Sequence, residues 1–261
     1  MNTNANSEYC DLSVDDNGIG TLCIQNAGKL NILGTPVIGA LTDALGHVAE
    51  RDDIRVLVVR GEGDRAFIAG ADIKEMAHFD MQRAEIFIDG LRKLSDAVRL
   101  LPKPVIARIP GWCLGGGMEF ALACDLRIGA DAAKMGMPEV KVGIPSIIQA
   151  ALLPRLIGTA RSNWMLLTGE IVAADKALNW GLFDSVVPLA ELDEEVTRVA
   201  GMLAGLAPAA LAQQKRLLRE WENEPLETSI LNGVREFAQA FNTGEPQKYM
   251  GEFIKAKQKS S

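Results

Sequence analysis

The stretch IPGWCLGGGMEF (residues 109–120) places three consecutive glycines directly before a segment with the composition of a helix. Glycines in this position let the backbone approach a ligand where a Cβ atom would collide. The N–H groups of a helix's first turn have no partners inside the helix, and the helix dipole favours negative charge there. The N–H of Gly116 can therefore hold a developing oxyanion. Glu119, three residues further on, lies on the same face of that turn, so one element offers both groups.

Two further stretches carry groups for the same chemistry. In AFIAGADIKEM (residues 66–76), small residues after a strand predict a second exposed N–H at Ala71, and Asp72 is suited to cap the helix that follows. In MPEV (residues 137–140), Glu139 lies twenty residues beyond Glu119. Two glutamates across one pocket can remove a proton from one atom and deliver a proton to another. Closeness and partial burial would then separate their pKa values.

Each of these stretches also has a purely structural interpretation. Glycines before a helix commonly form a tight strand-to-helix turn, and a glutamate in the first turn often only complements the helix dipole. The glycine run is not a dinucleotide-binding fingerprint, because no Gly-x-Gly-x-x-Gly follows the strand. Spacing in the sequence leaves open whether Glu119 and Glu139 meet.

The elements that must position these groups follow from the apolar periodicity. Short apolar alternations over residues 8–30, around a turn at 15–18, predict paired strands. Predicted helices cover 36–50, 81–101 and 115–123, and predicted strands cover 55–60 and 105–109. Strand and helix alternate in this order, which predicts an α/β fold with a largely parallel sheet.

From about residue 147 the pattern becomes almost wholly helical. The predicted helical segments cover 148–156, 160–167, 173–179, 190–206, 208–222, 225–241 and 245–258. The change of composition at about 190–205 predicts a core domain over 1–195 and a helical region over 196–261. C-terminal helices rich in Ala and Leu often pack against a partner subunit, so self-association is expected.

The bulk composition narrows the classes of function. The chain has 261 residues, of which 48% are hydrophobic and 23% charged, as in an ordinary globular protein with a sizeable core. The net charge of −7 disfavours non-specific nucleic-acid binding. No run approaches the roughly 18 apolar residues of a membrane span. Residues 1–8 have the composition of a loose tail without a targeting signal, so we expect a cytoplasmic protein.

Side chains for other chemistries are few. The four cysteines lack paired spacing and are predicted to be free thiols; they are Cys10, Cys23, Cys113 and Cys124. The two histidines, His47 and His78, lie far apart in the sequence. A histidine-based triad or a multi-histidine metal site is therefore hard to build, and no metal is expected.

Taken together, the motifs AFIAGADIKEM, GWCLGGGMEFALACDLRIGA and MPEVKVGIP resemble the crotonase superfamily, the enoyl-CoA hydratase/isomerase family. The likeness runs from about Leu12 to the C-terminus. It implies an α/β fold in which repeated β-β-α units form a spiral core, with a helical C-terminal region that builds homotrimers, which usually pair into homohexamers. It also implies an oxyanion hole made by the N–H groups of Ala71 and Gly116. Glu119 and Glu139 fall on the two positions that hydratases of this family occupy with glutamate.

The resemblance also implies where an acyl-coenzyme A thioester would bind. The expected contacts with substrate and coenzyme A come from Lys29, Leu30, Ala69, Gly70, Asp72, Ile73, Lys74, Trp112, Gly115 and Ser146. Coenzyme A is part of the substrate, and no separate metal or redox cofactor is expected. In the family a C-terminal lysine helps hold the phosphates, whereas here the alignment places Ala256 at that position, with Lys255 and Lys257 alongside.

A second departure from the family follows Glu139. Many hydratases continue with Pro-Gly-x-Gly-Gly-Thr, whereas this chain has GIPSIIQ at residues 143–149, one residue shorter. Ser146 is expected to take over the contact with water. Bulky Trp112, Ile147 and Ile148 indicate a restricted acyl pocket, although core packing explains them equally well.

The expected reaction is hydration of a 2-enoyl-CoA to a 3-hydroxyacyl-CoA. In this reaction Glu119 and Glu139 act as acid and base, while Ala71 and Gly116 hold the enolate-like intermediate. The altered loop keeps other reactions of the superfamily open: enoyl-CoA isomerisation, acyl-CoA hydrolysis or hydration of a specialised acyl-CoA. A non-catalytic RNA-binding relative is a further alternative, against which the net charge argues.

Overall fold

The computed structural model describes residues 6–259; residues 1–5 of the predicted tail and the side chain of Lys259 lie outside the described part. The strands are β1 (Cys10–Val14), β2 (Ile19–Ile24), β3 (Val56–Gly61), β4 (Ala66–Ile68), β5 (Val105–Ile109), β6 (Trp112–Leu114), β7 (Leu126–Ala130), β8 (Lys134–Gly136), β9 (Ile171–Ala173) and β10 (Ser185–Val187). The α-helices are α1 (Thr35–Glu50), α2 (Ile73–Met76), α3 (Met81–Leu100), α4 (Gly116–Ala123), α5 (Leu153–Ile157), α6 (Thr159–Thr168), α7 (Ala174–Trp180), α8 (Leu192–Ala204), α9 (Pro208–Trp221), α10 (Leu226–Ala240) and α11 (Glu245–Lys259). Short 3-10 helices are η1 (Glu139–Val142), η2 (Ile148–Leu152), η3 (Leu189–Glu191) and η4 (Phe241–Thr243).

Two sheets share the strands. The larger has six strands in the order β1-β2-β3-β5-β7-β10, and the smaller has four in the order β4-β6-β8-β9. Only the pairs β1–β2 and β8–β9 are antiparallel among the pairings of the described strands. The predicted α/β fold with a largely parallel sheet is confirmed.

The chain visits the two sheets in turn, and this produces a spiral. β3, β5 and β7 each enter the larger sheet, and the strand that follows each of them, β4, β6 or β8, enters the smaller one. Helix α3 follows the first of these units and α4 follows the second. The predicted repeat of β-β-α units is therefore present. Because β4, β6 and β8 are parallel neighbours, their carboxyl ends lie at one edge of the smaller sheet.

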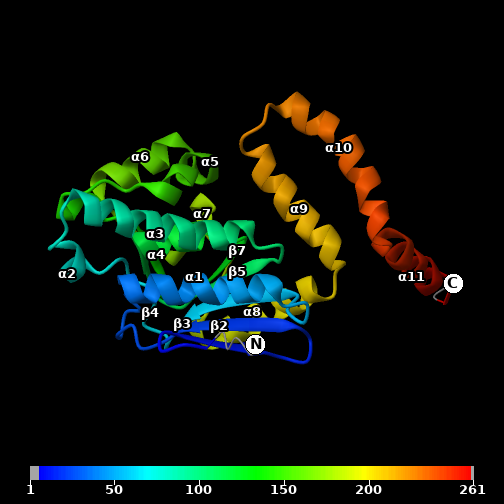
Figure 1. The fold of residues 1–261 in the computed structure, drawn as a ribbon, viewed down its shortest axis with the longest axis horizontal. Coiled ribbons are helices and arrows are strands. Elements are labelled where there is room, and N and C mark those ends of the chain that lie inside the picture. Colours follow the sequence, from blue (N-terminus) through cyan, green and yellow to red (C-terminus); the bar gives the residue numbers. More distant parts are fainter. Residues whose placement is uncertain (1–5, 260–261) are drawn as a thin grey trace.

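The larger sheet is buried on both faces, as expected for a parallel sheet covered by helices. In β3, Leu57 and Val59 belong to the main apolar cluster with α1, α3 and α4. Val56 and Val58 point the other way and pack with Leu192 and other residues of α8 in a second cluster. Figure 1 shows α1 and α3 lying along one side of the strands. The strand residues 56–59 are apolar without alternation because both of their faces are covered.

Most predicted elements form where expected, but the sequence patterns do not predict several of the strands, among them β6, β7 and β8. Residues 15–18 form the turn between β1 and β2, in which the Asp15 carboxylate accepts hydrogen bonds from the N–H groups of Asn17 and Ile19. The prediction that the chain beyond residue 147 is almost wholly helical misses β9 and β10. Each of these has three residues and extends an existing sheet, so neither leaves a periodic pattern of its own.

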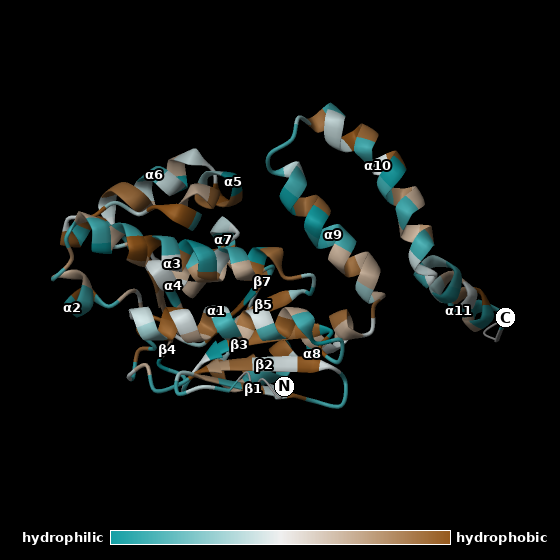
Figure 2. Ribbon diagram, in the orientation of Figure 1, coloured by the Kyte–Doolittle hydropathy of each residue, from teal (hydrophilic) through white to brown (hydrophobic). Residues whose placement is uncertain are grey.

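The last three helices, α9–α11, form an arm that leaves the rest of the molecule, which we call the body (Figure 1). The predicted boundary between residues 195 and 196 falls within α8, which packs on the larger sheet. The division into two regions stays a prediction. Figure 2 shows hydrophobic residues along α10, and large apolar side chains are exposed there: Leu226, Ile230, Leu231, Val234 and Phe237. No helix among residues 6–259 is long and apolar enough to cross a membrane.

Candidate active site

The turn from β6 into α4 has a backbone that only glycine can supply. Gly115, which precedes α4, has φ +53° and ψ −128°, a conformation that side-chain-bearing residues rarely adopt. A Cβ atom on Gly115 would also lie 2.7 Å from Oε1 of Glu139. The turn therefore brings the first amides of α4 close to the Glu139 carboxylate. At the start of α4 the Gly116 N–H has no partner among the hydrogen bonds of the described residues.

A second free amide comes from the loop that follows β4. Gly70 has φ +116°, and its carbonyl accepts the Leu33 N–H at 3.0 Å. The Leu33 carbonyl accepts the N–H of Asp72 at 3.0 Å, so the Ala71 N–H between these two bonds is left without a partner within residues 6–259. The Ala71 nitrogen lies 3.9 Å from the position that a Cβ on Gly116 would take. The two predicted oxyanion donors are thus neighbours.

Glu119 lies in the first turn of α4 and is almost fully buried, with 4% of its surface exposed. The N–H of Ala150 donates to its Oε1 at 3.2 Å. Burial raises the pKa of Glu119 from its ordinary value of 4.5 to about 8; the Ala150 N–H opposes the shift and the negative charge of Glu139 adds to it. In the free protein at neutral pH, Glu119 therefore carries a proton.

Glu139 begins η1, just beyond the end of β8, and is half-buried. The Ser146 hydroxyl donates to its Oε2 at 2.8 Å, and its Oε1 faces Gly115. Ser146 thus contacts the second glutamate directly. Its predicted contact with water stays a prediction. The shortened loop at 143–149 supplies this hydroxyl, so the departure from the family pattern has a definite structural effect.

Both glutamates and both amides face one cavity of about 300 Å³. The cavity is lined by Ala71, Met76, Phe79, Ala84, Glu85, Phe87, Ile88, Leu91, Gly116, Glu119, Glu139, Ile144, Pro145, Ser146 and Ile147. Most of its walls are apolar, and we call it the acyl cavity after the group that the family resemblance leads us to expect there. The pairing of Glu119 with Glu139, which spacing left open, is made by the tertiary structure. Phe79, Phe87 and Leu91 were not identified from the sequence as site residues. Phe87 and Leu91 have the spacing of an ordinary core-facing helix, and Phe79 lies in the loop before that helix.

A second cavity, of about 370 Å³, adjoins the first and shares Ala71, Gly116 and Glu139 with it. It is lined by Ala69, Gly70, Ala71, Ile73, Met76, Ala77, Leu114, Gly115, Gly116, Pro138, Glu139, Lys141, Val142 and Ile144. Predicted substrate contacts Ala69, Gly70, Ile73 and Gly115 are among these residues. Lys141 was not identified from the sequence, where it looks like any surface lysine.

The other predicted substrate contacts lie elsewhere or have another role. Lys29, Leu30, Lys74 and Trp112 line neither of these two cavities. The Trp112 ring lies under the Lys134 ammonium, 4.8 Å from it. Their part in binding coenzyme A stays a prediction.

The predicted capping role of Asp72 is confirmed. Its carboxylate accepts the N–H groups of Lys74 at 2.8 Å and Glu75 at 3.2 Å, and so caps α2. A carboxylate that holds the first turn of α2 also fixes the loop carrying the Ala71 N–H. Its predicted contact with the substrate stays a prediction.

The site groups lie at one edge of the smaller sheet, just beyond the ends of three parallel strands. Ala71 lies three residues beyond the end of β4, Gly116 two beyond β6 and Glu139 three beyond β8. Fold and site together define a class of protein: a β-β-α spiral in which paired backbone amides face a protonated and a second carboxyl group. Residues 15–260 match the profile of the family described as Enoyl-CoA hydratase/isomerase, and the chain belongs to that family.

Known proteins of this family resemble the chain along most of its length. It is 34% identical to crotonyl-CoA hydratase of Syntrophomonas wolfei, with 85% of each chain covered. It is also 34% identical to (E)-benzylidenesuccinyl-CoA hydratase of Thauera aromatica, over 82% of this chain and 84% of the relative. The crystal structure of an enoyl-CoA hydratase from Bacillus anthracis superposes with a TM-score of 0.90 at 28% identity, covering 95% of this chain and 96% of the other. The crotonase fold expected from the motifs is therefore confirmed.

Proposed function

We propose that this protein hydrates 2-enoyl-CoA thioesters to 3-hydroxyacyl-CoA. The observation that carries the proposal is the convergence of Glu119, Glu139 and the N–H groups of Ala71 and Gly116 on one cavity. The hydratase names of the relatives support the same reaction. A single carboxylate would serve a simple shift of a proton, whereas addition of water requires an acid and a base at two neighbouring carbons.

The thioester oxygen accepts hydrogen bonds from the Ala71 and Gly116 amides. These donors stabilise the negative charge that develops on that oxygen, and one such donor is typically worth about 3–4 kcal/mol. Water adds its oxygen to the β-carbon and gives its proton to an ionised carboxylate, while the partner carboxyl delivers a proton to the α-carbon. The pair must therefore enter the reaction with one proton in total. The raised pKa of Glu119 supplies that proton at neutral pH.

The two adjoining cavities support an orientation for the substrate. They share Ala71, Gly116 and Glu139, so the thioester carbonyl belongs at their junction. The acyl chain then lies in the acyl cavity, beside Glu119 and Ser146. The pantetheine end of coenzyme A follows the cavity bounded by the 69–73 loop and Lys141.

The proposal is tested by measuring hydration of crotonyl-CoA by the purified protein and by Glu119→Gln and Glu139→Gln. Each variant is expected to lose about a thousandfold in kcat, because it removes a proton donor or acceptor without changing shape. Glu194→Gln, an exposed glutamate on α8, serves as the matched control. Full activity in Glu139→Gln, with its melting temperature unchanged, would refute the hydratase mechanism.

A second candidate is hydration of a specialised acyl-CoA, or another reaction of the superfamily. The observation in its favour is the 143–149 loop, which places Ser146 on Glu139 and lines the acyl cavity with Ile144, Pro145 and Ile147. The likeness to (E)-benzylidenesuccinyl-CoA hydratase also supports a bulky acyl group. Product analysis over linear, aromatic and β,γ-unsaturated acyl-CoAs separates these reactions, because isomerisation moves a double bond and hydrolysis releases free coenzyme A.

We also propose that the arm associates with other copies of the chain, as homotrimers or homohexamers. The apolar residues Leu226, Ile230, Val234 and Phe237 are spaced at helical intervals and are exposed on α10. Exposed stripes of this kind are stabilised by an apolar partner surface.

A further inference from the structure

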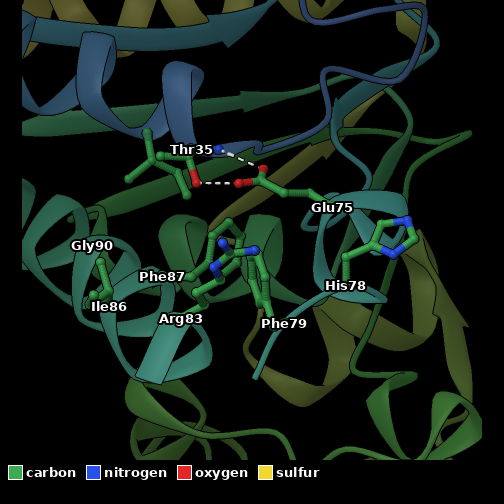
Figure 3. A pocket seen from close by; sticks show the side chains of 9 residues that line it. Thr35, Glu75, His78, Phe79, Arg83, Ile86, Phe87 and Gly90 are labelled. Atoms are coloured by element: carbon green, nitrogen blue, oxygen red, sulfur yellow. Dashed lines mark hydrogen bonds between the residues drawn. The ribbon is translucent and has the colours of Figure 1, made fainter. Parts of the chain in front are cut away.

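A third cavity, of about 450 Å³, lies beside the acyl cavity, between the start of α1, the loop after α2 and the first turns of α3. It is lined by Thr35, Ile38, Glu75, His78, Phe79, Arg83, Ile86, Phe87 and Gly90. We call it the rear chamber. Figure 3 shows Phe79, Phe87 and Arg83 lying together across from Thr35 and Glu75. Nothing in the hydration mechanism uses this space.

Two phenylalanine rings separate the rear chamber from the acyl cavity. Phe79 and Phe87 line both spaces. Their ring centroids are 5.2 Å apart with the planes tilted by 54°, so the rings form a continuous aromatic partition. A linear acyl chain that extends past Glu119 would meet this partition.

The two rings differ in how firmly they are held. Phe87 belongs to α3 and is 5% exposed, within the main apolar cluster. Phe79 is half-buried and lies between α2 and α3, where its N–H donates to the Met76 carbonyl at 3.0 Å. Phe79 packs against the edge of that cluster, so its truncation opens the partition with a smaller loss of core packing than truncation of Phe87, which is a buried member of the cluster.

The walls of the rear chamber suit hydrocarbon. Ile38, Ile86 and the two rings supply apolar surface. Glu75, the carboxylate among the described residues of the lining, accepts the Thr35 N–H at 2.9 Å and the Thr35 hydroxyl (Figure 3). The side chains of His78 and Arg83 also line the chamber and are exposed to solvent. An alkyl chain would meet no buried unpaired charge there, and burial of each methylene group would favour binding.

We propose that Phe79 determines substrate chain length: it closes the acyl cavity to long alkyl chains, and the rear chamber behind it receives them when the ring is absent. The inference rests on the proposed function, because it assigns the acyl cavity to the acyl part of an enoyl-CoA. The native protein is then expected to act on linear short-chain 2-enoyl-CoA thioesters.

The first experiment compares crotonyl-CoA with 2-decenoyl-CoA as substrates for the native protein and Phe79→Ala. The native protein is expected to favour crotonyl-CoA in kcat/KM. Phe79→Ala is expected to raise kcat/KM for 2-decenoyl-CoA by about tenfold, the value of burying roughly two further methylene groups. Met81→Ala, a variant at an 87% exposed residue of α3, is the control and should leave the ratio of the two substrates unchanged. An unchanged ratio in Phe79→Ala would overturn the proposal.

Binding of saturated acyl-CoAs separates this inference from the hydration proposal. Calorimetry with butyryl-CoA and decanoyl-CoA needs no catalysis, so a chain-length limit can appear even if no enoyl-CoA is hydrated. Phe79→Ala is expected to improve the Kd of decanoyl-CoA by about tenfold and to change that of butyryl-CoA little. An equal improvement in Kd for both ligands would show a general effect on the site and would contradict the proposal that Phe79 limits chain length.

The last experiment locates the end of the chain. A Cβ on Gly90 would contact Ile38 at an ordinary 3.5 Å, so a larger side chain there projects into the rear chamber, and glycine is a weak helix former in any case. Gly90→Leu in the Phe79→Ala background is expected to reverse the gain for decanoyl-CoA. If the double variant keeps the full gain, the alkyl chain leaves by another route and the rear chamber is not its site.

Discussion

The body and the arm bury their apolar side chains in different ways. The body holds its strands and helices around two apolar clusters, and among the described residues α9–α11 contribute no member to either cluster. The arm exposes large apolar side chains instead, with Val234 76% exposed. The site groups Ala71, Gly116, Glu119 and Glu139 all belong to the body. These four candidate catalytic groups therefore lie in the densely packed part of the molecule, away from the arm.

Polar contacts attach the arm to the body. The Lys215 ammonium on α9 donates to the carbonyls of Val98 and Lys103 and to the Asp125 carboxylate, at 2.7–3.0 Å. Arg99 of α3 pairs with Glu222, just beyond α9, at 2.5 Å. Directional bonds of this kind fix where the arm leaves the body without burying its apolar face. We therefore expect folding and catalysis to depend on the body, and the proposed assembly to depend on the arm.

The largest effect is expected from charging the arm's apolar stripe. Val234→Glu would place a carboxylate where we propose a subunit contact. Burial of an unpaired charge there would be strongly unfavourable, because the charge would lose its hydration. The variant is expected to lose its association with other copies, measured by light scattering during gel filtration. Glu252→Gln, at an exposed glutamate of α11, is the control. A native protein that is already monomeric at micromolar concentration would contradict the proposed role of the arm.

The second largest effect is expected from removing the buried ammonium group of Lys215, which attaches the arm to the body. Lys215→Met keeps the length of the side chain but leaves Asp125 and two carbonyls without their donor. Breaking a buried pair of this kind is expected to lower the free energy of unfolding by about 3 kcal/mol, measured by denaturant titration. Lys93→Met removes an exposed ion pair with Asp89 on the neighbouring helix α3 and should cost at most about 1 kcal/mol. Equal losses of unfolding free energy in the two variants would show that the contact of Lys215 with Asp125 is no stronger than a surface ion pair.

A smaller effect on stability is expected at Glu119, and it depends on pH. Between its ordinary pKa of 4.5 and the raised pKa of about 8, the folded protein keeps a proton that the unfolded chain loses. The resulting stabilisation is complete below pH 4.5 and is lost as the pH rises through 8.

A glutamine side chain has no proton to lose, so the melting temperature of Glu119→Gln should rise relative to the native protein between pH 5 and pH 8.5. The expected gain is at least about 3 °C, the shift for roughly 1 kcal/mol in a chain of this size. Scanning calorimetry at several pH values measures it, with Glu194→Gln as control. A constant difference across this range would mean that Glu119 titrates at its ordinary pKa.

The smallest effect is expected from the hydroxyl that holds Glu139. Ser146→Ala removes one hydrogen bond to a carboxylate, so kcat/KM for hydration should fall by about tenfold. Ser146→Thr retains the hydroxyl and should recover most of that loss. The same small fall in both variants would show that the side-chain volume at residue 146 matters and that the hydrogen bond does not.

The local sequence determined the individual parts of the site. Glycines at 115–117 predicted a turn with open amides, Asp72 predicted a cap, and the motifs predicted Ala71 and Gly116 as oxyanion donors. These features depend on backbone conformations and hydrogen bonds that reach only a few residues along the chain. The helices beyond residue 190 were predicted for the same reason, since periodicity is a local property.

Only the tertiary structure decided which parts meet. β4, β6 and β8 have three residues each, too few for a recognisable pattern, yet their parallel pairing places Ala71, Gly116 and Glu139 at one edge. The bond from Ser146 to Glu139 and the burial that protonates Glu119 likewise depend on neighbours from other turns of the spiral. The partition formed by Phe79 and Phe87 was not apparent from the sequence, because Phe87 has the spacing of any core-facing residue of α3 and Phe79 lies in the loop before that helix. Contacts between distant segments depend on how the whole chain packs, so spacing along it could not reveal them.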